Sequence, residues 1–75
     1  MTRKERIEAT LRRELSPSHL ELIDESHQHS VKPGAESHFK LIVASERFEG
    51  RSPVARQRLV YGALREEFAA GLHAL

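Results

Sequence analysis

The chain has 75 residues, which is enough for one small domain and too few for two. Hydrophobic residues make up 39% and charged residues 31%, a balance typical of a compact soluble fold and not of a disordered segment. The formal net charge of +1 does not by itself indicate a nucleic-acid ligand. Because the chain has no cysteine, disulfide bonds and thiolate metal sites supplied by this chain alone are excluded.

The sequence predicts first an amphipathic helix that begins near the N-terminus. Thr2 and Glu5 have the spacing of a capping box, in which each side chain accepts from the other residue's backbone N–H. Apolar residues then recur every fourth position, and Ser16 with Pro17 ends the pattern. The apolar stripe of this helix is Ile7, Leu11 and Leu15.

Two strands are expected next, separated by a polar loop over residues 26–37. The first is short and runs from Leu20 to Asp24, and the second runs from His38 to Ser45. Alternation in the second strand gives one apolar face and one mixed face. The apolar face consists of Phe39, Leu41 and Val43.

A second helix is predicted after a turn over residues 47–51 that is centred on Gly50. Ser52 has the character of an N-cap and Pro53 of the first helical residue. The helix is expected to continue to about Ala70, where Gly71 ends it. Gly62 inside it costs about 1 kcal/mol against alanine. Either close packing of this helix on the sheet or a neutral substitution explains that glycine.

The last four residues, from Leu72 to Leu75, have the pattern of a strand that begins here. Two strands alone are marginally stable in water, and two helices need a wider sheet to cover. We therefore expect a third strand that begins near Leu72 and is completed by a longer natural chain or by a neighbouring molecule. The N-terminus has no apolar signal core, and no stretch approaches the roughly 20 apolar residues of a membrane span. These features favour a cytoplasmic protein without a membrane partner.

Histidines are the first candidates for chemistry, since the chain has five of them. His29 in the polar loop is either a solvated side chain or a metal ligand, and His73 is either a structural histidine or a ligand. His38 opens the second strand, where a structural role is the ordinary one. Two histidines do not close a metal site, so a metal centre here requires a partner that supplies the other ligands.

Arginines around the Gly50 turn are the second candidate. A glycine lets the backbone approach a phosphate, and a helix N-terminus with nearby arginines attracts anions. The alternative is an ordinary solvated helix face, and no tryptophan is present to stack on bases. An enzyme is not expected, because no residue set supplies nucleophile, base and oxyanion donors. The candidate nucleic-acid residues are Arg47, Gly50, Arg51, Arg56 and Arg58.

Five local motifs occur in a fixed order along the chain, and together they resemble the BolA family. They are Asp24-Glu25-Ser26, Gly34 with Glu36-Ser37-His38-Phe39, Phe48-Glu49-Gly50, Arg56 with Arg58, and His73-Ala74-Leu75. The resemblance implies an α/β fold of the class II KH-like type, α-β-β-α-(β), with helices packed on one face of a small mixed sheet. It also implies one domain over residues 1–75 that lacks the end of the third strand and a C-terminal helix.

The resemblance further implies a protein partner and a cofactor. BolA-like proteins bind monothiol glutaredoxins and share a [2Fe–2S] cluster with the glutaredoxin cysteine and a bound glutathione thiol. The positions that match the family's ligands are His73 and His29. His38 also matches a family position, and we assign it a structural role. No cofactor is expected in the isolated chain, and a homodimer is left open.

Some members of the family resemble transcription regulators that bind DNA through the KH-like helix-turn face. In this chain that face runs from Gly50 to Arg58. Between Arg56 and Arg58 the family usually has histidine, whereas this chain has Gln57, which puts a role for that side chain in doubt. DNA binding in transcription or in a stress response is therefore the alternative function.

Overall fold

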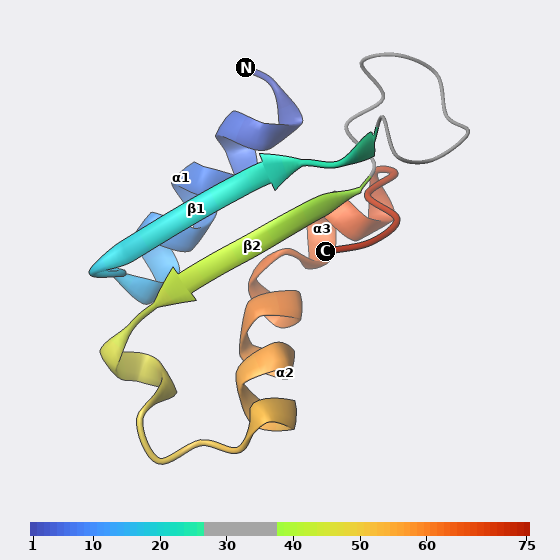
Figure 1. The fold of residues 1–75 in the computed structure, drawn as a ribbon. Helices are drawn as coiled ribbons and strands as arrows, with labels where there is room; N and C mark the ends of the chain where they lie inside the picture. Colours follow the sequence, from blue (N-terminus) through green and yellow to red (C-terminus); the bar gives the residue numbers. More distant parts are fainter. Residues whose placement is uncertain (27–37) are drawn as a thin grey trace.

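The computed structural model describes residues 1–26 and 38–75, and the prediction for His29 lies outside these ranges. Figure 1 shows two strands with the helices gathered behind them. The strands pair antiparallel, with Leu22 opposite Leu41. In chain order the elements are α1 (Arg3–Leu15), β1 (His19–Asp24), β2 (Phe39–Ala44), the 3-10 helix η2 (Glu46–Phe48), α2 (Pro53–Ala63) and α3 (Arg65–Ala69).

Both ends of α1 are fixed by local hydrogen bonds. The Glu5 backbone N–H donates to Thr2 Oγ1 at 3.1 Å, and the Thr2 N–H donates to Glu5 Oε1 at 3.0 Å. At the other end Ser16 takes the left-handed conformation, with φ 43°, and its N–H donates to the Arg12 carbonyl at 3.1 Å. The predicted capping box and the predicted end of the helix are confirmed.

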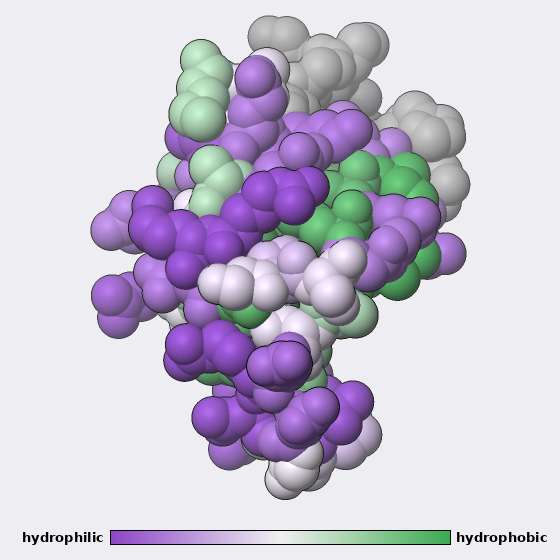
Figure 2. All heavy atoms as spheres, turned by 90° about the vertical axis from the view of Figure 1, so that its left-hand side faces the viewer, coloured by the Kyte–Doolittle hydropathy of each residue, from purple (hydrophilic) through white to green (hydrophobic). Residues whose placement is uncertain are grey.

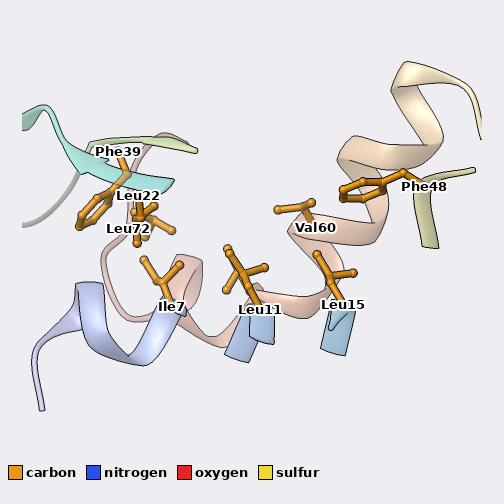
Figure 3. Packing of buried hydrophobic residues seen from close by; sticks show 9 residues of the cluster. Ile7, Leu11, Leu15, Leu22, Phe39, Phe48, Val60 and Leu72 are labelled. Carbon is orange, nitrogen blue, oxygen red and sulfur yellow. The ribbon is translucent and has the colours of Figure 1, made fainter. Parts of the chain in front are cut away.

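One face of the sheet is covered by the helices, and the core lies between them (Figure 3). Ile7 and Leu11 of α1 are fully buried, and Leu15 is 1% exposed. Exposure alternates along β2, where Phe39 is buried while Lys40 and Ile42 are exposed. The predicted apolar face of this strand is therefore the inner one. The remaining buried apolar residues are Leu22, Phe48, Val60, Leu64 and Leu72.

The opposite face of the sheet is open to solvent and carries a mixture of polar and apolar side chains. Ile23 is 44% exposed and Ile42 is 42% exposed on this face. Seen from the side of α1, the surface is mostly hydrophilic, with hydrophobic side chains gathered in one area (Figure 2). Among the described residues, no helix has the length and apolarity needed to cross a membrane.

The Gly50 turn and the start of α2 agree with the sequence prediction. Gly50 has φ 72°, a conformation that glycine adopts without steric cost. Ser52 Oγ accepts from the Ala55 N–H at 3.1 Å, and Pro53 is the first residue of α2. Ser45 anchors the preceding η2 segment, since its hydroxyl donates to the Leu15 carbonyl at 2.6 Å.

The prediction of one helix from Pro53 to Ala70 is wrong, because α2 and α3 are separated at Leu64. Leu64 has φ −101° and ψ 15°, and its N–H donates to the carbonyls of both Val60 and Tyr61. The bend directs Leu64 into the core, where it is 1% exposed. Close packing at Gly62 is also not found: apart from the neighbouring residues and the backbone of its own helix, a Cβ placed there meets no atom of the described residues within 4 Å.

The segment in which the sequence predicts the start of a third strand lies beside β2 and makes a single bridge to it. Gly71 has φ 121° and turns the chain after α3, and Leu72 then enters the core with 3% exposure. His38 and Ala74 form an isolated parallel bridge, and the Phe39 N–H donates to the Ala74 carbonyl at 3.0 Å. The sheet of the described residues thus has two antiparallel strands, and the last segment adds one parallel bridge at the start of β2.

Candidate metal site and basic turn

His73 lies exposed in a backbone segment that is fixed on both sides. Before it, the Leu72 N–H donates to the Glu67 carbonyl at 2.9 Å. After it, the Ala74 carbonyl accepts from Phe39, and the Tyr61 hydroxyl donates to the Leu75 carbonyl at 2.6 Å. The imidazole is thus accessible while its Cα is held against β2 and α2.

The structure brings His38 against His73. The two ring centroids are 5.6 Å apart and the rings make an angle of 85°. The contact follows from the register, because the bridge between His38 and Ala74 places the preceding residue, His73, next to the start of β2. Sequence reasoning gave His38 a structural role and no part in a metal site. The pair depends on the parallel bridge between His38 and Ala74, for which the sequence has no local signal.

The backbone at His38 is fixed from the end of β1. Its N–H donates to Ser26 Oγ at 3.1 Å, and its carbonyl accepts from the Glu25 N–H at 2.8 Å. Ser26 is 5% exposed, and its own N–H donates to Asp24 Oδ1 at 2.9 Å. The Asp24-Glu25-Ser26 motif therefore positions the start of β2 beside the His73 segment.

Of the two predicted cluster ligands, the structure places only His73, since His29 lies outside the described residues. Within residues 1–26 and 38–75, no group of three or more His, Asp or Glu side chains is arranged to hold a metal ion. His19 sits on the solvent face of the sheet, with Nε2 3.4 Å from Glu21 Oε1. The described part of the chain therefore offers two neighbouring imidazoles and an incomplete ligand set.

The arginines of the Gly50 turn are exposed, and two of them stabilise the turn. Arg51 Nε donates to the Arg47 carbonyl at 2.8 Å, and Arg56 Nε donates to the Arg51 carbonyl at 3.0 Å. A guanidinium carries five N–H donors, so each of these bonds uses one and leaves four. Arg47 and Arg58 also border a surface hollow of about 320 Å³.

The two candidate sites lie apart in the molecule. The Gly50 turn precedes the N-terminus of α2, while the C-terminal segment returns to the start of β2 (Figure 1). An apolar groove of about 330 Å³ lies between β2 and α2. Its lining includes Leu41, Val43, Val60 and Leu75.

Comparison with known proteins agrees with these features. A family model described as BolA-like protein matches residues 11–75. The chain is 46% identical over 72 residues to the DNA-binding transcriptional regulator BolA of Escherichia coli, covering 96% of this chain and 69% of that protein. It is 52% identical over 69 residues to human BolA-like protein 1, covering 92% of this chain and 50% of that protein. The chain thus spans about half the length of the mammalian relatives that it matches.

Solved structures give the same result. The BolA domain of SufE1 from Arabidopsis thaliana superposes with a TM-score of 0.93 at 44% identity, over 100% of this chain and 86% of that one. BolA1 from the same plant gives a TM-score of 0.92 at 42% identity, again over 100% and 86%. The family match, the identity to these relatives and the shared fold together show that the chain belongs to the BolA family.

Proposed function

We propose that this protein is a non-enzymatic adaptor that pairs with a monothiol glutaredoxin to hold a [2Fe–2S] cluster in iron–sulfur maturation or iron sensing. The observation that carries the proposal is the accessible His73 imidazole on an anchored backbone. An imidazole in place of a thiolate is an established way to ligate such a cluster, and it raises the reduction potential.

The donor set of the chain fits a shared site. The chain has no cysteine, so the sulfur ligands would come from the glutaredoxin and from glutathione. His73 would be one protein ligand and His29 the second, as the family resemblance implies. The role of the chain's own residues is to present imidazole nitrogens and to hold them in position. The backbone bonds at Leu72 and Ala74 serve the second task.

Reconstitution tests this proposal. The full-length protein is mixed with a monothiol glutaredoxin, iron, sulfide and glutathione, and a coloured heterodimer is expected. His73→Ala should change the visible absorption and circular dichroism, and so should His29→Ala. His19→Ala is the matched control, because this histidine is exposed at the start of β1, beside Glu21. An unchanged spectrum for His73→Ala would remove this residue from the site.

DNA binding is the second candidate, and two observations favour it. One is the exposed arginine cluster of the Gly50 turn, and the other is the similarity of the chain to the DNA-binding transcriptional regulator BolA of Escherichia coli. Phosphate contacts make affinity fall steeply with ionic strength. Arg51→Gln and Arg58→Gln should each reduce the slope of log affinity against log salt by about 1. Arg12→Gln on α1 is the control. Failure to shift any DNA at low salt excludes this function.

A further inference from the structure

We propose that His38 and His73 together form a two-imidazole site for a divalent first-row transition-metal ion such as Zn²⁺ or Ni²⁺. The site shares His73 with the proposed cluster site, but it requires neither the glutaredoxin nor the cluster. It also gives His38 a role as a ligand in place of the structural role that the sequence suggested.

The distance between the rings suits chelation. An imidazole nitrogen binds Zn²⁺ at about 2.0–2.1 Å, which places the ring centroid about 3.2 Å from the metal. Two rings whose centroids are 5.6 Å apart would then subtend about 120° at the ion, close to the tetrahedral range. The 85° angle between the planes does not oppose this arrangement, because the χ2 torsion of histidine is soft.

The backbone around the pair favours chelation as well. His38 is held through Ser26 and Glu25, and the His73 segment is held through Phe39 and Tyr61. Both Cα atoms are therefore fixed before an ion binds, so little conformational entropy is lost on binding. His73 is exposed and His38 is half-buried, so water or a partner group can occupy the remaining coordination positions. Imidazole is a preferred ligand for Zn²⁺, Ni²⁺ and Cu²⁺.

A packing role for His38 is the competing explanation, since edge-to-face contact alone holds two rings in this arrangement. The two explanations differ in what a substitution does. A ligand can be replaced by another ligand but not by an apolar ring of similar size. His38→Cys should therefore retain metal binding, and His38→Phe should abolish it. A packing role, in which His38 only holds the His73 ring in place, predicts the reverse: metal binding is retained in His38→Phe and lost in His38→Cys.

The test is a titration of the purified protein, without glutaredoxin, with Zn²⁺ while the histidine ring signals are followed by NMR. The signals of His38 and His73 should shift together with one equivalent of metal. Either histidine changed to Asn should weaken binding by at least about tenfold, since loss of even an outer partner of a ligand typically costs that much. His19→Asn should leave the affinity unchanged. His38→Cys loaded with Co²⁺ should show thiolate-to-cobalt absorption.

Three results would overturn the proposal. The first is that the wild-type ring signals of His38 and His73 do not shift together. The second is full metal affinity in His38→Phe, and the third is a loss of metal affinity in His19→Asn as large as that in His38→Asn. If His29→Asn abolishes binding while His38→Asn does not, the ion uses a different histidine pair and the assignment of His38 is wrong. If a substitution unfolds the chain, the wild-type titration still decides. None of these outcomes depends on whether a cluster forms with glutaredoxin.

Discussion

Arg6 on α1 and Glu67 on α3 form a two-pronged ion pair that joins the two ends of the fold. Arg6 Nε lies 2.9 Å from Glu67 Oε2, and Arg6 Nη2 lies 3.1 Å from Oε1. Arg3 adds a second guanidinium, with Nε 3.6 Å from Glu67 Oε1, and it donates to the Ala70 carbonyl at 3.0 Å. This pair fixes α3, and therefore the Gly71 turn that leads to His73, against the first turns of α1.

Glu67→Gln should lower the free energy of unfolding by about 1–3 kcal/mol, since two guanidinium groups lose their carboxylate partner in a partly buried position. Denaturant unfolding measures this change. Glu66→Gln is the control, because the neighbouring carboxylate is exposed. Equal stability of the two variants would show that the ion pair contributes nothing.

Tyr61→Phe should loosen the C-terminal segment. The change removes the 2.6 Å hydrogen bond to the Leu75 carbonyl but keeps the ring, whose centroid lies 4.8 Å from that of Phe68. We expect a loss of about 0.5–1.5 kcal/mol in stability. Amide hydrogen exchange at Ala74 and Leu75 should also be faster. Unchanged exchange at these two amides would contradict the role given to the hydroxyl.

Two glycine substitutions should act in opposite directions. Gly62→Ala should stabilise the chain by roughly 0.5–1 kcal/mol, because alanine is the better helix former and the position is open. Gly71→Ala should destabilise it by about 1–2 kcal/mol, because φ is 121° there. The new Cβ would also lie 3.1 Å from Arg3 Nη2. Thermal unfolding of both variants checks the signs, and a shift in the same direction for both would be contrary to expectation.

The capping box should make α1 sensitive to acid. The Thr2 backbone N–H, together with the Thr2 hydroxyl, lowers the pKa of Glu5 below its ordinary value of 4.5. A lowered pKa means that the stabilisation is present above the unfolded pKa and is lost as the pH falls through the folded pKa. Stability should therefore fall more steeply below about pH 4.5 in the wild type than in Glu5→Gln. Unfolding followed by circular dichroism at a series of pH values measures this difference in stability. Glu8→Gln, which removes a charge outside the cap, should keep the steeper wild-type fall.

Local signals were enough for most of the fold. The cap at Thr2, the stop at Ser16 and the alternation in β2 each depend on residues close together in sequence, and each is confirmed. The break at Leu64 could not be predicted in this way. The break accompanies two contacts between residues far apart in sequence, the burial of Leu64 in the core and the ion pair of Glu67 with Arg6.

The candidate site was harder to predict than the fold. His73 was identified because it follows a helix-ending glycine at the start of a strand, and because it matches a family position. The contact with His38 depends on which edge of β2 the last segment joins and in which register. Sequence spacing does not contain that information, since the two histidines are far apart along the chain.

The bonds that flank His73 affect how quickly this side chain could respond to an incoming ion. A ligand residue in a flexible terminal segment must first reach the binding conformation, and this step slows the binding of the ion. Here the neighbouring carbonyl of Ala74 is already paired with β2, so only the imidazole has to turn. The rate of ion binding at His73 would then be set by diffusion of the ion to the site and not by rearrangement of the chain.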